Sequence, residues 1–167
     1  MHDELTEVDI KKMKDEIDHR MKNLTPKLIE TMVQAREIGD LSENEEYRTA
    51  KRELNRNYAR IRYLKNMIST AVVIKVEYDE DTVGLFDRVT IHYEEDDEDR
   101  TIIIVTTLRN DVTKNLISKE SPVGRALLGK KVGDRVKIRV NDDYSYFIRV
   151  TALEKGTDDE SMDIASY

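Results

Sequence analysis

The stretch that decides the fold of this chain is Glu37-Ile38-Gly39-Asp40-Leu41-Ser42-Glu43-Asn44-Glu45-Glu46. It carries five carboxylates and no Lys or Arg, and it separates two stretches that each have the apolar periodicity of a helix. Gly39 can end the first helix, because a residue without a Cβ adopts a left-handed backbone freely. The pattern predicts the tip of an antiparallel helical hairpin.

The second helix needs an N-cap, and two candidates compete for that position. Asp40 with Glu43 has the spacing of a capping box, and so does Ser42 with Glu45. If Ser42 is the cap, Asp40 and Glu43 project from the end of the hairpin. In the alternative, all five acids only favour the positive end of the second helix.

Two apolar stripes flank the tip. The upstream stripe follows Thr6, which can cap a helix with Asp9 three residues on, and the second helix is expected over 43–69. Pro26 should bend the first helix, or restart it with Thr25 as cap; we expect a bend, because the stripe continues in phase. The stripes have heptad spacing and comprise Ile17, Met21, Leu24, Leu28, Thr31, Ala35 and Ile38, facing Tyr47, Ala50, Leu54, Tyr58, Ile61, Leu64 and Ile68.

The outer face of the second helix is expected to be basic. It carries Arg48, Lys51, Arg52, Arg56, Arg60, Arg62 and Lys65. Such a face can simply be solvated, or it can follow the phosphates of a nucleic acid. A basic stem below an acidic tip favours the second interpretation, since solubility alone does not require this polarity.

The period changes to that of strands near residue 71. Strands are expected over 72–78, 88–93, 101–107, 135–140 and 144–153, and a short helix over 121–129 with Ser121 as cap, Pro122 first and Gly129 at the end. The fold class is therefore α+β, a helical hairpin followed by a small antiparallel sheet. The expected domains are the hairpin over 1–76, the sheet domain over 77–155 and an acidic, disordered tail over 156–167.

Composition excludes several classes of protein. The chain has no Cys, and His2, His19 and His92 are too scattered for a catalytic triad. Six glycines form no phosphate-binding loop. No apolar run reaches the roughly 20 residues of a membrane span, and the acidic start does not have the pattern of a signal peptide. We expect a cytoplasmic, monomeric protein.

The tip carboxylates are the remaining candidates for chemistry. Asp40 and Glu43 could offer oxygens to Mg²⁺, which often takes only one or two protein carboxylates and fills its shell with water and phosphate. Two exposed acids bind an ion weakly, so such a tip would act inside another enzyme's nucleic-acid site, where two metal ions share phosphoryl-transfer chemistry.

Two separate motifs resemble those of the bacterial Gre transcript-cleavage factors. One is the tip run from Ala35 to Tyr47, and the other runs from Ile117 to Lys130. Pro26 also stands where that family often has proline, whereas Asp9 and Asp87 stand where it usually has glycine. The resemblance reaches from the start of the chain to about Leu153.

The resemblance implies a coiled coil that enters the secondary channel of bacterial RNA polymerase, and a C-terminal domain similar to FK506-binding proteins. It implies that Asp40 and Glu43 hold a second Mg²⁺ only within the polymerase complex. The polymerase then cuts backtracked RNA near its 3′ end, and the factor itself is not an enzyme. Further roles implied are tip support for Arg36, Asn44 and Tyr47, RNA or channel contacts for Arg48, Lys51, Arg52, Arg56 and Arg60, and docking on the polymerase for Glu120, Ser121 and Pro122.

Three other functions fit the sequence less fully. The same fold could be a channel-binding inhibitor of RNA polymerase, with the extra acid Glu45 helping to trap the metal unproductively. A prolyl isomerase needs a deep aromatic pocket, but the chain has no Trp and two Phe. A coiled-coil scaffold without chemistry does not explain the charge polarity.

Overall fold

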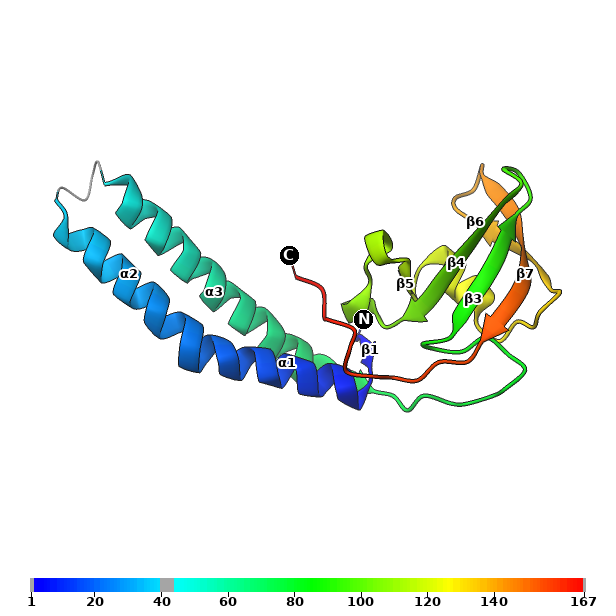
Figure 1. Ribbon diagram of the computed structural model, residues 1–167, viewed down its shortest axis with the longest axis horizontal. Coiled ribbons are helices and arrows are strands. Elements are labelled where there is room, and N and C mark those ends of the chain that lie inside the picture. The colour runs from blue at the N-terminus through cyan, green and yellow to red at the C-terminus, as the bar shows by residue number, and fades with distance from the viewer. Residues whose placement is uncertain (1, 40–43, 167) are drawn as a thin grey trace. The chain divides into compact units, whose positions relative to one another are not determined.

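A computed structural model describes residues 2–39 and 44–166 (Figure 1). The chain forms two compact units, Ile10–Ala71, here the hairpin unit, and Met1–Asp9 with Val72–Tyr167, here the C-terminal unit. This grouping differs by a few residues from the division expected at residue 76. The first nine residues group with the C-terminal part of the chain, and the hairpin ends at Ala71.

The first arm of the hairpin is continuous through Pro26. It comprises α1 (Glu7–His19), the π-helical turn η1 (Arg20–Leu24) and α2 (Thr25–Glu37). Thr25 has helical φ and ψ, so the alternative of a helix restarted by a Thr25 cap is wrong. Its N–H and its Oγ1 both donate to the carbonyl of Arg20, five residues back. The interruption is thus a π turn just before the proline, where Thr25 bonds the carbonyl five residues back instead of four.

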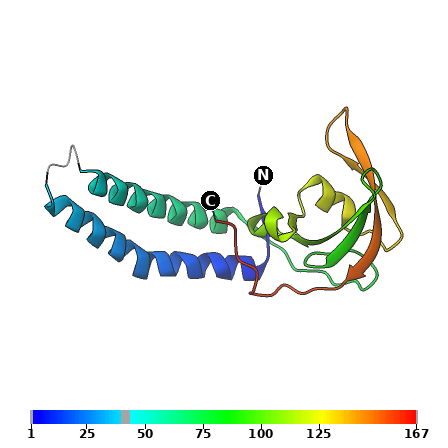
Figure 2. The ribbon, with the colours of Figure 1, turned by 45° about the horizontal axis from the view of Figure 1, so that its top comes forward.

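The second arm is α3 (Glu45–Thr70), which lies beside α2 in both ribbon views (Figures 1 and 2). The expected stripe is buried at Ala35, Ala50, Leu54, Ile61 and Leu64. The predicted stripe is wrong at Met21, which is 51% exposed. Met21 lies in the π turn, and this wider turn rotates its side chain away from the apolar stripe.

The stripe is also wrong at Tyr58, because Asn57 is buried in its place. Asn57 Nδ2 donates to Thr25 Oγ1 at 2.7 Å, and its Oδ1 accepts from Arg20 Nη1 at 3.1 Å. A polar layer therefore crosses the hairpin at the level of the π turn.

The C-terminal unit is built on a five-stranded sheet in the order β5-β4-β3-β7-β6 (Figure 1). Its strands are β3 (Arg88–Tyr93), β4 (Glu98–Val105), β5 (Leu116–Ser118), β6 (Arg135–Arg139) and β7 (Ser145–Glu154). Three pairings are antiparallel, but β4 and β5 are parallel, so the sheet is mixed rather than purely antiparallel. The β5 strand is too short to have shown a period in the sequence.

The core of this sheet follows the alternation of β3, in which Val89 and Ile91 are fully buried, and of β6 and β7. Burying each such side chain contributes about 1.5–3 kcal/mol. The short helices are α4 (Pro122–Leu127), η2 (Thr107–Arg109) and η3 (Val112–Lys114). None of the helices in the described part of the chain is both long and apolar enough to cross a membrane.

Within the C-terminal unit, the structure differs most from the sequence-based expectation at residues 72–78 and in the tail. The strand expected over 72–78 is only β2 (Val72–Val73), which pairs in parallel with β1 (Glu4–Leu5). The tail was expected to be disordered, but it contacts the domain. Ala165 N–H donates to the carbonyl of Leu108 at 2.7 Å, and Asp158 lies 2.6 Å from Arg109. Contacts with buried residues place this acidic segment against the domain, which its composition does not predict.

Candidate functional site

The two carboxylates predicted to be catalytic, Asp40 and Glu43, lie outside the described residues. The structure describes the chain on either side of them. On the first side, α2 ends at Glu37, with Ile38 as its C-cap. Gly39 then has a φ of +156°, a backbone conformation that a residue with a Cβ rarely adopts.

On the other side Asn44 is the N-cap of α3, so neither Asp40 nor Ser42 holds the position expected for it. Asn44 Oδ1 accepts from the Tyr47 N–H at 3.0 Å, and Asn44 Nδ2 donates to the carbonyl of Ala35 at 2.6 Å. The first bond satisfies an N–H that an uncapped helix leaves open. The second adds a donor to the Ala35 carbonyl, which also accepts from the Ile38 N–H at 3.3 Å. One amide therefore joins the ends of both helices at the tip.

A groove of about 470 Å³ lies just below the tip, between α2 and α3. Ala35, Ile38 and Ala50 give it an apolar floor, and Glu45, Glu46 and Glu53 contribute carboxylates. Ile38 is 71% exposed, which is unusual for a large apolar side chain in a hairpin stripe. Of the predicted tip-support residues, Arg36 is exposed and Tyr47 is half-buried.

The predicted basic face is present on α3, with one correction. Its exposed members are Arg48, Lys51, Arg52, Arg56, Arg62 and Lys65. Arg60 is only 5% exposed, and it binds Glu16 through Nε to Oε1 at 2.9 Å and Nη2 to Oε2 at 3.1 Å. The expectation that Arg60 lies on the exposed face is therefore wrong, because its guanidinium faces α1 inside the hairpin unit. Its contact with RNA or the channel stays a prediction.

Glu16 is the centre of this partly buried ion cluster. Arg20 Nε also donates to Glu16 Oε1, at 2.8 Å. Burial raises the pKa of Glu16, but hydrogen bonds from Arg60 and Arg20 and their charges outweigh it, so the pKa is lowered from its ordinary value. This cluster could not be predicted from the sequence, since a heptad pattern marks apolar positions only.

The residues expected to dock on a polymerase also hold α4 in place. Ser121 is its N-cap and accepts from the Gly124 N–H at 2.9 Å, and Pro122 is its first residue, as predicted. Glu120 Oε2 accepts from Arg125 Nη2 at 3.1 Å. Gly124 is required because a Cβ there would lie 2.2 Å from the carbonyl of Ser118. The loop is thus well determined, and Glu120 remains exposed.

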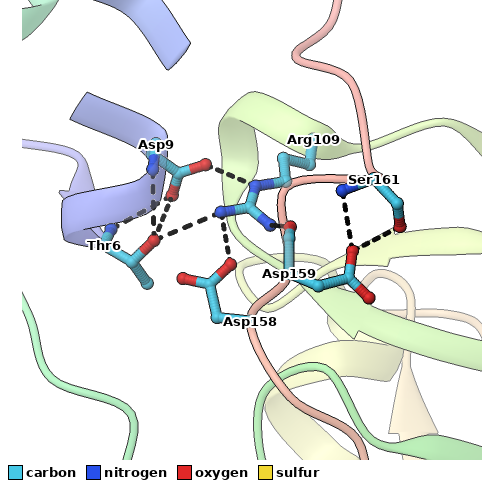
Figure 3. A network of polar contacts seen from close by, with 6 residues as sticks. All are labelled: Thr6, Asp9, Arg109, Asp158, Asp159 and Ser161. Carbon is cyan, nitrogen blue, oxygen red and sulfur yellow. Dashed lines mark hydrogen bonds and ion pairs between the residues drawn. The ribbon is translucent and has the colours of Figure 1, made fainter. Parts of the chain in front are cut away.

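A second polar cluster lies in the C-terminal unit and centres on Arg109 (Figure 3). No sequence pattern singled out this residue. Thr6 and Asp9 form the expected reciprocal cap of α1, with Thr6 N–H to Asp9 Oδ2 at 3.1 Å and Asp9 N–H to Thr6 Oγ1 at 3.3 Å. Asp9 Oδ1 then accepts from Arg109 Nε at 2.6 Å. A pair separated by 100 residues leaves no trace in a single sequence.

The other unusual acid, Asp87, is buried and fully engaged. Its Oδ2 accepts from the Gly84 N–H at 2.7 Å and pairs with Lys155 Nζ at 2.5 Å, and its Oδ1 accepts from the Gly156 N–H at 3.0 Å. Both acids that depart from the Gre pattern therefore have structural partners within the C-terminal unit. Within residues 2–39 and 44–166, no three His, Asp or Glu side chains are grouped so as to hold a metal ion.

Comparison with known proteins gives two family matches that together span most of the chain. Residues 4–73 match the model described as "Transcription elongation factor, N-terminal", and residues 78–155 match "Transcription elongation factor, GreA/GreB, C-term". The segment after residue 155 lies beyond both matches.

Curated relatives agree with these matches. The chain is 46% identical over 135 residues to transcription elongation factor GreA of Thermosipho melanesiensis, covering 81% of this chain and 86% of the relative. It is 37% identical over 150 residues to GreA of Acholeplasma laidlawii, covering 90% and 95%. Among solved structures, it is similar to GreA factor homolog 1 (Gfh1) of Thermus thermophilus at 24% identity and a TM-score of 0.42, covering 93% of this chain and all of that one.

Proposed function

The chain belongs to the GreA/GreB family of transcription elongation factors, and we propose that it inserts its hairpin into the secondary channel of bacterial RNA polymerase and stimulates Mg²⁺-dependent cleavage of backtracked RNA. The polymerase performs the cleavage, and the factor contributes residues at the tip. The observation that carries this proposal is the tip sequence between Gly39 and Asn44, held at both ends by defined helix termini.

The capping geometry supports a chemical role for the tip. Asn44 makes the capping hydrogen bond of α3 and also bonds the end of α2. The helix therefore does not need a side chain of the 40–43 segment as its cap. Asp40 and Glu43 are therefore not required as caps, which supports their proposed role as metal ligands.

The donor set fits Mg²⁺. Asp40 and Glu43 are the residues that would hold the ion, and two carboxylates suit a cation that completes its shell with water and phosphate oxygens. A second ion in a phosphodiester-cleaving site activates water or stabilises the leaving oxygen. The factor would thus supply negative charge at a place where the polymerase and the RNA supply the other ligands.

The stem and the C-terminal unit would give binding and position. The exposed basic residues of α3, Arg48, Lys51, Arg52 and Arg56, would contact RNA phosphates or acidic walls of the channel. Glu120, Ser121 and Pro122, held rigidly around the start of α4, would contact the polymerase exterior. A loop that is ordered before binding loses little entropy on docking.

A channel-binding inhibitor is the second candidate, and the acids around the groove below the tip favour it. Glu45, Glu46 and Glu53 add carboxylates close to the tip. Glu45 Oε1 accepts from Arg48 Nη1 at 3.0 Å, which reduces its availability to a metal. This contact is our reason for placing cleavage first.

The deciding experiment adds the purified protein to a backtracked elongation complex with Mg²⁺. Cleavage stimulation would release short RNA fragments that carry the 3′ end, and elongation would resume from the new end. An inhibitor would release no fragments and would slow synthesis on complexes that are not backtracked. The second result would overturn the cleavage proposal.

A further inference from the structure

Arg109 is a fully buried arginine that two distant acidic segments share (Figure 3). Nε donates to Asp9 Oδ1 at 2.6 Å, and Nη2 donates to Thr6 Oγ1 at 3.2 Å. Nη2 also lies 2.6 Å from Asp158 Oδ1, and Nη1 donates to the carbonyl of Asp159 at 3.4 Å. The guanidinium carbon stands 4.8 Å from the centre of the Phe86 ring.

The two carboxylates on Arg109 are held unequally. The Asp9 side chain is completely buried and accepts hydrogen bonds from Arg109 Nε and from Thr6. The Asp158 side chain is 13% exposed, and its Oδ1 accepts no hydrogen bond from any described residue, although it is close to Nη2. Asp158 is therefore bound through charge and proximity, and Asp9 through directed hydrogen bonds.

Because the two carboxylates are held unequally, releasing Asp158 costs less free energy than breaking an isolated buried ion pair. Breaking a buried ion pair is strongly destabilising when it leaves a buried charge without a partner. Here Asp9 stays on Arg109 when Asp158 leaves, so the guanidinium keeps its counter-charge. The carboxylate of Asp158 regains water.

Beyond Arg109, the contacts of the tail include an apolar contact and a backbone hydrogen bond. Met162 packs against the cluster of Phe86, Val105 and Leu116, and Ala165 bonds the carbonyl of Leu108. A cavity of about 710 Å³ lies along the tail, with Ile103, Lys114 and Leu116 among its lining residues. The tail forms one wall of this cavity, since Ser161, Asp163, Ile164 and Ala165 also line it.

We propose that residues 158–165 form a reversible latch, an acidic segment that occupies a peptide-binding groove over Arg109 and the Phe86 cluster. The groove takes an acidic side chain at Arg109 and an apolar side chain four residues later at Phe86, which Asp158 and Met162 supply. When the latch opens, the C-terminal unit stays folded and the groove can accept an acidic peptide of the same spacing. This inference is independent of the cleavage activity.

Hydrogen exchange at the Ala165 amide, measured in the full chain, tests the latch. Asp158→Asn removes the charge that faces Arg109, and Asp163→Asn removes the same charge from an exposed position in the same segment. Since an interaction with a charged group is worth about tenfold in an equilibrium constant, Asp158→Asn should lower protection of Ala165 about tenfold. Asp163→Asn should leave it unchanged. The amides of β3 should keep full protection in both variants.

Two results would overturn the latch. Protection of Ala165 that is unchanged by Asp158→Asn would show that the ion pair does not hold the tail. A parallel loss of protection in β3 would show that the tail is an inseparable part of the domain.

A peptide of residues 156–167, added to the full-length Asp158→Asn protein, tests the groove. The peptide should shift the Arg109 Nε–H resonance, whereas the same peptide with Asn at 158 should bind at least about tenfold more weakly. Absence of binding by the unmodified peptide would contradict the groove, since the tail of the variant competes for it about tenfold less well.

Discussion

Arg60 Nε lies 2.9 Å from Glu16 Oε1, and Arg60 Nη2 lies 3.1 Å from Glu16 Oε2, so the two residues form a bidentate ion pair between the arms of the hairpin. The Arg60 side chain is 6% exposed and the Glu16 side chain 21%. A pair with this geometry, next to the π turn, aligns α1 with α3. We expect its main effect to be on the register of the arms, since a buried ion pair is seldom more stabilising than apolar packing.

Arg60→Ala should destabilise the hairpin unit by about 3 kcal/mol, because it leaves Glu16 partly buried with only Arg20 as its partner. Arg56→Ala, at an exposed position one turn away, is the matched control and should change stability by less than about 0.5 kcal/mol. Urea unfolding followed by circular dichroism measures both. If the two variants lowered the free energy of unfolding equally, Arg60 would behave as an exposed residue of the basic face and not as a buried partner of Glu16.

The same pair predicts a pH dependence. The pKa of Glu16 is lowered from its ordinary value of 4.5, so the folded state favours the charged carboxylate. This contribution is fully present above the unfolded pKa, and it is lost as the pH falls through the folded pKa. Stability of the hairpin should therefore decrease below about pH 4.5, and Glu16→Gln should reduce that slope. The slope is measured by urea unfolding at a series of pH values, and an identical slope in Glu16→Gln would contradict the prediction.

The helical arms were predictable because apolar spacing at heptad intervals is a local property, and so were β3 and α4. The polar contacts within the hairpin were not predictable. Asn57 interrupts the stripe as if it were a surface residue, and its partners Arg20 and Thr25 lie more than 30 residues away. The cap at Asn44 was missed because Asp40 and Ser42 carry the same chemistry, and spacing alone cannot rank three oxygen-bearing side chains.

The Arg109 cluster shows the same limit in the C-terminal unit. Thr6 with Asp9 was readable as a local cap, but the third member lies 100 residues further on. The acidic tail has the composition of a disordered segment, and it is ordered by one buried guanidinium and one apolar cluster. Residues that act through partners distant in sequence were therefore the ones that the sequence could not place.

Asn44→Ala should destabilise the tip by more than the loss of one helix cap does. It removes the bond to the Tyr47 N–H and the bond to the Ala35 carbonyl, and the capping loss alone costs about 1 kcal/mol. Asn44→Asp is the discriminating control, because its carboxylate still caps α3 but cannot donate to Ala35. Cleavage on backtracked complexes should fall in both variants, whereas thermal stability should fall mainly in Asn44→Ala. Full cleavage by Asn44→Asp would show that the link to α2 has no role in positioning the tip.

Charge reversal on the exposed basic face should weaken association with polymerase without changing the chemistry. Replacing Lys51, Arg52 and Arg56 by Glu should raise the Kd and reduce its salt dependence, because fewer ion contacts form. Binding measured between about 50 and 200 mM salt gives the slope. Cleavage at saturating factor should be retained. An unchanged Kd and slope would remove the basic face from the binding surface.

The strongest prediction concerns Asp40 and Glu43. Asp40→Asn and Glu43→Gln keep the size of each side chain but remove the negative charge that Mg²⁺ requires. Cleavage should fall by orders of magnitude, since each loss of about 1.4 kcal/mol in transition-state stabilisation is a factor of ten. Helix content and polymerase affinity should remain close to those of the unmodified protein, because Asn44 supplies the cap of α3.

The dependence on Mg²⁺ separates a metal ligand from a residue that only stabilises the helix end. Raising the Mg²⁺ concentration should partly restore cleavage by Asp40→Asn, because mass action refills a weakened site. A defect in helix stability would not respond to the ion in this way, and it would lower the free energy of unfolding by at most about 1 kcal/mol. If the unmodified protein instead slows synthesis without cleaving, and Glu45→Ala relieves that block, the protein is an inhibitor. Wild-type cleavage by both Asp40→Asn and Glu43→Gln would place the metal-binding residues elsewhere.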